Sequence, residues 1–599
     1  MSAKKRALAM LSLLLVLSML FVACQPQPAE DPVEPEGETT VDEPADEPAD
    51  EPADEPTDEP ADEPADEPAD EPADEPADEP AAEGDRKVAT FIWTQEFDSL
   101  NPLYTSMWFV TITYQLWNAA GWDFNADLET VPVLLTEVPS VENGGVSEDG
   151  LTLTFNLRDD IVWSDGEPIT ADDFVFTHNM IMAPGNAVAT TYPNDLVTNI
   201  SAPDERTVVM EFEEPFAAWQ SYFWRYLLPE HILGPVYEAE GTIDSAEWNL
   251  APTVGAGPYV FEEWESGSFA RFVRNENYYG EPPIIDEIFI RFVPDDAAQV
   301  AALRNAEGDL GTFIAYSDIP SLEEAGVEVL AVPSGYAEGW FPYLGEDGHP
   351  ALQDVRVRQA LAYGFDRQTL VDDLLLGLTD AAATLWDDTP YVDPGIEPYP
   401  YDPDRAMELL DEAGWVDSND DGTRDKDGVE LVLLHGTTTR EIRQDAQAVA
   451  QQQLAEIGVG LEITNYDADI FFAGIADGGP AASGELDIFQ WSDAPFYPDP
   501  DHYYWLCSEI PTDDYQDGGN WQRICDEDLD AMFQEQQTLL DYDERVALFN
   551  DISRHMYEQV YWLGLWKDPD IWAFSSRLQQ GPMSGPSPFY SIATWDLGQ

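Results

Sequence analysis

The segment from Asp417 to Asp425 places oxygen-bearing side chains at alternating positions, the pattern with which an EF-hand loop surrounds Ca²⁺. Its candidate ligands are Asp417, Asn419, Asp421 and Asp425. The twelfth position of such a loop carries a bidentate glutamate, but here it is Gly428, and no flanking pair of helices is apparent. We therefore expect a polar hairpin turn, and weak calcium binding remains the open alternative.

No complete catalytic or nucleotide-binding motif occurs in the sequence. Gly255 and Gly257 suggest a dinucleotide-binding loop, but a third glycine is missing and Pro258 would break the helix that such a loop requires. The chain has no nucleophile elbow, no zinc-protease motif and no phosphate-binding loop, and its six histidines are scattered. Paired carboxylates carry no information in so acidic a chain. These patterns indicate a binding protein without a cofactor, and not an enzyme.

The composition is strongly acidic. The chain of 599 residues has 120 aspartates and glutamates against 25 lysines and arginines, for a formal charge of −95. A field of that sign repels nucleic acids and anionic membranes, so we exclude both as direct ligands. The simplest interpretation is a highly soluble surface, and adaptation to salty water is the alternative.

The N-terminus has the pattern of an export signal. Lys4, Lys5 and Arg6 precede an apolar run from Ala7 to Ala23, which is too short and wrongly flanked for a membrane span. The run ends in small residues before Cys24, which resembles the bacterial lipobox. We expect residues 1–23 to be a lipoprotein signal peptide and Cys24 to carry the lipid. An ordinary signal peptide with a chance cysteine is the alternative.

A proline-rich acidic tract follows, and we assign residues 24–86 to the lipidated cysteine and a linker. The tract repeats Asp-Glu-Pro-Ala from Asp42 onward, so alanine is the only apolar side chain of the repeat. Such a segment buries too little surface to offset the entropy of ordering, while proline and like charges keep it extended. We expect a disordered, stiff spacer between the lipid and the globular part.

Residues 151–176 of the globular part contain the patterns of a strand, a turn and a helix, which are elements that can position a binding site. Leu151, Leu153, Phe155 and Leu157 alternate with polar residues, the period of a half-buried strand. Asp165 and Gly166 turn the chain, and Thr170 with Asp173 forms a capping box that begins a helix. The sequence therefore predicts a rigid strand, turn and helix within one short segment.

Three phrases of the sequence resemble a known family. Residues 157–176 closely follow the pattern L-R-x-x-V-x-W-S-D-G-x-P-x-T-A-x-D-V-x-F. Residues 354–363 read DVRVRQALAY. Residues 401–415 begin with YDP and end with EAGW. In this order they resemble the extracytoplasmic solute-binding proteins of peptide-type ABC transporters, known as family 5. This family includes oligopeptide-, dipeptide- and nickel-binding members.

The resemblance implies an α/β, two-lobed periplasmic-binding-protein type II fold. Lobe one would comprise residues 87–338 and 564–599, with an extra subdomain at roughly 126–235, and lobe two would comprise 339–563. The two lobes would close around a ligand that contacts both of them.

The function that the resemblance implies is the capture of peptides for import. The protein would be the extracytoplasmic substrate-binding component of an ABC importer, a monomer that is lipid-anchored at the outer face of the cytoplasmic membrane or in the cell envelope. Its partners would be the permease subunits and, indirectly, the cytoplasmic ATPase. Oligosaccharide binding is the first alternative because the chain has 19 tryptophans. Nickel binding is disfavoured without a histidine cluster, and a calcium-dependent surface protein or a secreted hydrolase stays less favoured.

The resemblance also implies a ligand-binding residue. In peptide-binding members a loop after a strand carries an aspartate that accepts the α-ammonium group of the ligand, and Asp493 is the matching position. The loop here is one residue short and lacks the family's glycine, so a surface aspartate is the alternative. We add four aromatic residues to this candidate ligand-binding set: Trp491, Tyr104, Trp108 and Trp340.

Cys507 and Cys525 are the cysteines of the globular part. Outside the cytoplasm we expect them to form a disulfide, which would stabilise the fold by roughly 3 kcal/mol for so short a loop.

Overall fold

The computed structural model describes residues 86–598, apart from 106, 476–477, 495–497, 513–514 and 517. The predicted signal peptide, Cys24 and almost all of the acidic spacer lie outside the described residues. The described residues belong to one compact unit, Ala81–Gln599. Within them, no helix combines the length and the apolar character needed to cross a membrane.

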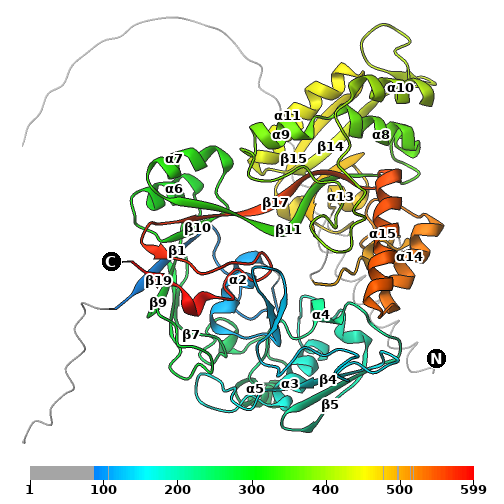
Figure 1. Cartoon of the computed structure of the whole chain (residues 1–599). Helices are drawn as coiled ribbons and strands as arrows, with labels where there is room; N and C mark the ends of the chain where they lie inside the picture. The colour runs from blue at the N-terminus through cyan, green and yellow to red at the C-terminus, as the bar shows by residue number, and fades with distance from the viewer. Residues whose placement is uncertain are drawn as a thin grey trace, which may run out of the picture. The chain divides into compact units, whose positions relative to one another are not determined.

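A ten-stranded mixed sheet runs through this unit (Figure 1). The strand order is β15 (Gly460–Tyr466), β14 (Val432–Thr438), β16 (Ile488–Asp493), β11 (Glu328–Pro342), β17 (Leu563–Phe574), β10 (Leu310–Thr312), β1 (Val88–Trp93), β9 (Glu287–Phe292), β8 (Phe269–Arg274) and β7 (Tyr259–Glu265). We refer to the part built on β1 and β7–β10 as lobe one, and to the part built on β14–β16 as lobe two. This arrangement is the predicted α/β, two-lobed fold.

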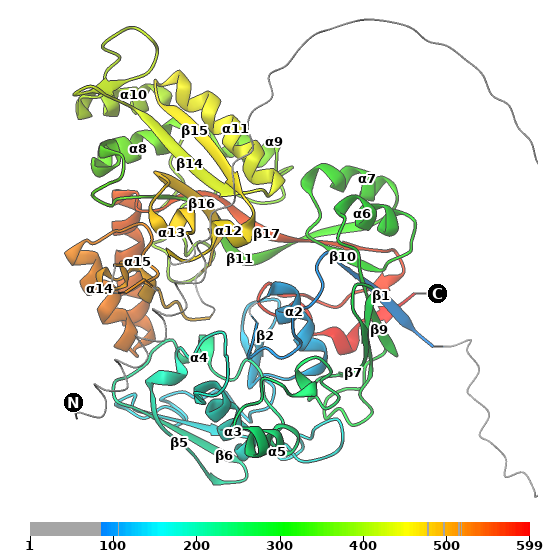
Figure 2. The ribbon, with the colours of Figure 1, turned by 180° about the vertical axis from the view of Figure 1, so that it is seen from behind.

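The antiparallel pair β11–β17 joins the two lobes (Figures 1 and 2). One end of the pair continues into lobe one, because β10 pairs with β17 there, and the other end continues into lobe two, because β16 pairs with β11. The register shifts between Pro333 and Tyr336 and again between Glu338 and Gly339, and such bulges bend a strand. The predicted lobe boundaries, 338/339 and 563/564, fall within β11 and at the start of β17.

Helices cover both faces of the sheet in lobe two. Trp340 and Phe341 are neighbours in β11 but belong to different hydrophobic clusters, as alternation along a strand requires. The Trp340 face packs against α8 (Val355–Gly364), α9 (Arg367–Asp373), α10 (Pro403–Ala413) and α11 (Glu441–Glu456). The Phe341 face packs against α14 (Glu527–Thr538) and α15 (Tyr542–Gln559).

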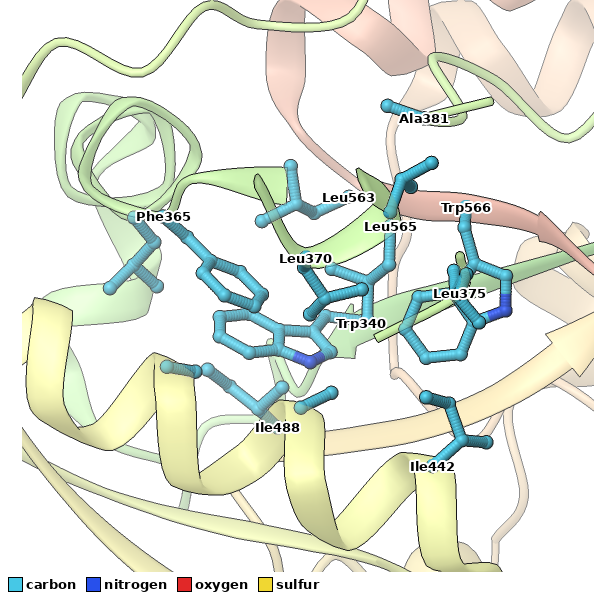
Figure 3. Packing of buried hydrophobic residues seen from close by; sticks show 14 of the residues in the cluster. Trp340, Phe365, Leu370, Leu375, Ala381, Ile442, Ile488, Leu563, Leu565 and Trp566 are labelled. Carbon is cyan, nitrogen blue, oxygen red and sulfur yellow. The ribbon is translucent and has the colours of Figure 1, made fainter. Parts of the chain in front are cut away.

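The Trp340 cluster extends from lobe two into lobe one. It includes Ile92 of β1 together with residues of α6 (Asp296–Arg304) and α7 (Ile319–Glu324). Figure 3 shows the indole of Trp340 among Phe365, Ile488 and Leu563. Because one core serves both lobes on this side, the β11–β17 pair is anchored at both of its ends.

A three-stranded subdomain is attached to lobe one, where an extra subdomain was expected. Its sheet has the order β4 (Thr152–Asn156), β6 (Thr207–Phe212) and β5 (Val197–Asp204), with α3 (Ala171–Met182) and α5 (Glu230–Glu240) beside it. Thr170 caps α3, and the Asp173 side chain accepts a hydrogen bond from the Thr170 backbone N–H. The predicted strand and capped helix are therefore confirmed. The subdomain has its own hydrophobic cluster.

Candidate functional site

A cavity of about 800 Å³ lies between the two lobes. Trp108, the first residue of α2 (Trp108–Trp117), and Phe313, which directly follows β10, line it from lobe one. Arg440, between β14 and α11, lines it from lobe two, and Asp568 and Asp570 line it from β17. The cavity is thus built at the carboxyl ends of strands, where ligands of open α/β sheets bind.

Aromatic side chains on the cavity wall remain accessible. Phe313 is 47% exposed and Tyr336 of β11 is 46% exposed, although both lie beside well-packed cores. The rings of Phe313 and Trp108 meet edge to face with centroids 4.8 Å apart. Phe313 also has a positive φ of 56°, an uncommon conformation for a large side chain. Exposed rings within a concave surface are typical of a ligand site.

A buried ion pair forms the lobe-two wall of the cavity. The guanidinium of Arg443 donates two hydrogen bonds, of 2.8 and 2.9 Å, to the carboxylate of Glu338, whose side chain is 0% exposed. Gln490 Nε2 donates a further hydrogen bond of 2.9 Å to Glu338 Oε1, and Arg443 Nη1 donates to Thr438 Oγ1 at 2.8 Å. The charge of Arg443 is therefore neutralised within the protein.

A second ion pair lies next to it, on β17. Arg440 donates to both oxygens of Asp568, at 2.7 and 3.2 Å, and Trp566 Nε1 donates to Asp568 Oδ1 at 3.2 Å. Burial alone would raise the pKa of Asp568, but the Arg440 guanidinium holds that pKa below its ordinary value. The Ser492 hydroxyl lies 2.5 Å from Glu338 Oε2 and 2.6 Å from Asp568 Oδ2, so it connects the two pairs.

Asp570 is a partly buried carboxylate of the cavity wall that belongs to neither of these ion pairs. It lies two residues beyond Asp568 on β17, and successive side chains alternate along a strand, so both carboxylates are on one face. No described residue donates a hydrogen bond to the Asp570 carboxylate. Burial, together with the nearby charge of Asp568, raises the pKa of Asp570 to about 7, and Arg440 offsets this only in part.

The five candidate ligand-binding residues from the sequence have different environments. Trp108 lines the cavity. Asp493 and Trp491 lie in β16 on the face opposite Ser492, outside the cavity wall. Tyr104 is half-buried and packs against the core of lobe one.

Asp493 nonetheless lies near the cavity. Its carboxylate accepts hydrogen bonds from the Tyr504 hydroxyl and from the backbone N–H of Ala494, both at 2.9 Å. Burial raises the pKa of Asp493 to about 6. Burial raises the pKa of Tyr336 as well, and the negative charges of Asp493 and Asp570 raise it further.

Two of the predicted ligand-binding tryptophans, Trp340 and Trp491, stack on other aromatic rings and do not line the cavity. Trp340 was expected in the cleft, but it is 2% exposed and stacks on Phe365 in the core, with ring centroids 5.1 Å apart. Its indole N–H donates to Gln490 Oε1 at 3.0 Å, so its polar atom is also satisfied. Trp491 stacks on Phe341 at 3.9 Å and on Phe489 at 5.3 Å. The placement of Trp340 corrects the expectation from the sequence.

Sequence reasoning missed Arg440, Arg443, Asp568 and Asp570. Two signals point to them. The last long strand is apolar except for a central Lys-Asp-Pro-Asp, which is unusual for a strand inside a sheet. Arg440 and Arg443 form a close pair of arginines at a helix start, in a chain that has few basic residues.

The segment from Asp417 to Asp425, predicted to be a polar hairpin turn, is a hydrogen-bonded turn. The backbone N–H groups of Asp421 and Gly422 donate to the carboxylate of Asp417, at 3.2 and 3.0 Å. Asp425 accepts two hydrogen bonds from Ser418, and it begins the short hairpin of β12 (Asp425–Lys426) and β13 (Val429–Glu430). Nowhere in the described residues do three or more histidine, cysteine, aspartate or glutamate side chains form a group that could hold a metal ion.

The segment that follows β16 contains the two cysteines. Cys507 and Cys525 are joined in a disulfide with Cα atoms 4.9 Å apart. The bond closes a loop next to α14 and thereby restrains the chain that follows Asp493 in the sequence.

The family model described as "Bacterial extracellular solute-binding proteins, family 5 Middle" matches residues 129–510, more than half of the chain. The oligopeptide-binding protein AppA of Bacillus subtilis is 27% identical over 325 residues, which cover 52% of this chain and 58% of that protein. The nickel-binding periplasmic protein of Escherichia coli is 25% identical over 467 residues, 75% of this chain and 83% of that protein. The chain thus spans less than two thirds of the length of the peptide-binding relative.

Solved structures share the fold. AppA from Bacillus subtilis in complex with a nonapeptide superposes with a TM-score of 0.67 at 20% identity, covering 86% of this chain and 100% of that one. NikZ from Campylobacter jejuni in complex with Ni(L-His) gives a TM-score of 0.70 at 21% identity, covering 85% and 99% of the two chains.

Proposed function

Because this chain belongs to the bacterial extracellular solute-binding proteins of family 5, we propose that it captures peptides for an ABC importer. Members of this family are binding proteins and not enzymes. The ligand would enter the cavity between the lobes and be delivered to membrane permease subunits, with a cytoplasmic ATPase driving import.

The cavity between the lobes is the observation that carries this proposal. Its wall combines residues of lobe one, of lobe two and of the β11–β17 pair. A ligand that contacts all three stabilises the arrangement in which the lobes face each other, and a permease can then distinguish loaded from empty protein. The bulged strand pair is the element about which such closure would occur.

Peptides are the ligand class that we favour. The size of the cavity and its accessible rings suit an extended ligand with varied side chains. Main-chain groups at the strand ends can hold a peptide backbone by hydrogen bonds, which tolerates different sequences. The oligopeptide-binding relative and its nonapeptide complex support the same choice.

Two other ligand classes stay as outcomes of the test. Oligosaccharides stack on aromatic rings, and Trp108, Phe313 and Tyr336 offer such rings. A nickel chelate is suggested by the nickel-binding relative, but no histidine is among the described residues that line the cavity.

The location outside the cytoplasm follows from the family, and the lipid anchor at Cys24 is part of the proposal. Metabolic labelling with a fatty acid tests the anchor, because Cys24→Ser would abolish the label if the thiol carries the lipid. Retained label in that variant would contradict the assignment.

Native mass spectrometry of the purified chain, before and after mild unfolding to strip bound material, tests the ligand class. A ladder of peptide masses that disappears after stripping supports the peptide receptor. Hexose-spaced masses or a nickel-containing adduct would replace it with one of the alternatives. A protein that carries nothing and is not stabilised by any peptide in a thermal-shift screen would overturn the proposal.

A further inference from the structure

We propose that the cavity recognises a positively charged group of its ligand, an ammonium or a guanidinium, and that Asp570 is the carboxylate that binds it. This inference rests on the proposed function in one respect only, that the cavity between the lobes is the capture site.

The distribution of charge around the cavity favours a cation. Six carboxylates and two guanidinium groups line it. Both guanidinium groups are already committed, since Arg443 pairs with Glu338 and Arg440 pairs with Asp568. An anionic ligand would have to break one of these pairs. A cationic ligand meets no uncompensated positive charge and several uncompensated carboxylates.

Four of the six carboxylates are exposed, and they cannot fix a ligand precisely by themselves. Asp296, Asp373, Glu441 and Asp445 carry this exposed charge. Water and salt screen them, so they attract a cation to the cavity without specifying where it binds.

Asp570 differs from these four because it is partly buried and no described residue donates a hydrogen bond to it. A carboxylate that is withdrawn from water without a donor is costly, and the like charge of Asp568 adds to that cost. Asp493, in contrast, already accepts two hydrogen bonds at 2.9 Å. A ligand cation would therefore gain more by binding Asp570, whose charge the protein leaves uncompensated.

The Tyr316 hydroxyl is a second and independent indication that a polar group of a ligand binds in the cavity. Tyr316 follows β10, lines the cavity and is only 7% exposed, yet its hydroxyl has no hydrogen-bond partner among the described residues. Buried hydroxyl groups are nearly always paired, so a ligand N–H is the natural partner. Tyr316 and Asp570 line the same cavity. Burial raises the pKa of this phenol, and the charges of Asp568 and Asp570 raise it further.

The aromatic wall fits the same chemistry. The accessible faces of Trp108, Phe313 and Tyr336 can contact the cation or its alkyl chain. A cation over such a ring gains roughly 0.5–2 kcal/mol, in addition to what the carboxylate provides. The ligand class assigned by these contacts is a basic peptide, or a peptide whose free N-terminal ammonium enters the cavity.

Calorimetric titration of the full chain at 0.15 M NaCl tests the inference with four probes: trilysine, trialanine, N-acetyltrialanine amide and the non-peptide cation spermidine. We expect trilysine or trialanine to bind at least tenfold more tightly than the acetylated, uncharged peptide. Asp570→Asn should remove this preference, whereas the matched variant Asp127→Asn, at an exposed carboxylate outside the cavity, should change affinity less than threefold. Thermal melting of both variants controls for folding.

Each outcome decides between the two proposals. Peptides that bind wild-type protein and Asp570→Asn equally well would overturn the role of Asp570 and leave the peptide receptor standing. Spermidine binding that depends on Asp570, without binding of any peptide, would overturn the peptide receptor and leave the cation site. If none of the four probes binds, both are overturned.

Discussion

The phenol of Tyr192, in the three-stranded subdomain, donates a hydrogen bond of 2.5 Å to the carboxylate of Asp501, which lies in lobe two after β16. Asp501 accepts a second hydrogen bond, of 3.1 Å, from Gln536 of α14. Nearby, the Ser221 hydroxyl donates to the backbone carbonyl of Asp499 at 2.7 Å. The subdomain and lobe two are thus connected at a place that is separate from the β11–β17 pair.

Removing the Tyr192–Asp501 contact should weaken ligand binding. Tyr192→Phe deletes one hydrogen bond to a charged group, worth about 1.5–3 kcal/mol. This bond is present in the conformation in which the subdomain contacts lobe two in addition to the connection through β11–β17. We expect the dissociation constant for peptide to rise roughly tenfold, measured by calorimetry. Tyr542→Phe, at a tyrosine that is 56% exposed, is the matched control. Unchanged affinity in Tyr192→Phe would show that the contact does not contribute to closure.

Breaking the Arg443–Glu338 pair should strongly destabilise the protein. Arg443→Met leaves the fully buried Glu338 carboxylate without its partner, and such a loss costs about 3–5 kcal/mol. Urea unfolding measures the change. Arg405→Met serves as the control, since Arg405 contacts Glu408 in an exposed pair that should contribute little to stability. Equal effects of the two substitutions would refute the buried pair as a stabilising element.

Removing the Asp570 charge should stabilise the ligand-free protein while it weakens cation binding. Because the pKa of Asp570 is raised to about 7 in the folded state, its contribution to stability falls as pH rises from about 4 to 7, and the loss is complete above pH 7. We expect Asp570→Asn to be more stable than wild type at pH 8, by at most about 4 kcal/mol, and equally stable near pH 3.5. Thermal melting at both values checks this, and a destabilised variant at pH 8 would contradict it.

Cation binding should depend on pH through the same group. A bound cation favours the ionised form of Asp570, so binding releases protons near pH 7 and weakens as pH falls. Asp568, Arg440, Tyr316 and Tyr336 line the cavity together with Asp570, and none of these four groups titrates near neutrality. Asp493, outside the cavity wall, is the other nearby carboxylate with a raised pKa, of about 6. We expect trilysine affinity to fall between pH 8 and pH 5.5, by at most about tenfold per unit. Asp570→Asn should flatten the profile, and an equally steep profile in that variant would assign the dependence to another group.

The sequence predicts local features of this fold well. Ala406, Leu409, Leu410 and Ala413 recur at helical spacing, and they form the buried stripe of α10, which begins after the N-cap Asp402 and ends before Gly414. Caps and amphipathic stripes depend on residues a few positions apart, so a single sequence contains the information that specifies them.

The candidate site could not be predicted to the same extent, because it depends on strand pairing. The role of Asp570 follows from its register opposite Val332 and from its neighbour Asp568, and neither the pairing nor the bulges of β11 leave a pattern in the sequence. Trp340 shows the same limit. The density of aromatic residues predicts that some rings line a cleft. Trp340 is in the core because its face of β11 packs against α8 and α11, and the sequence alone does not show which face that is.

The central place of β17 also has a consequence for how the protein is made. Residues 563–574 are synthesised well after β10 and β11, yet they fill the gap between these two strands. Until a ribosome has delivered this strand, β10 and β11 each have an open edge, and the sheet is divided into two parts. The nascent chain therefore cannot complete its central sheet before this strand has been made.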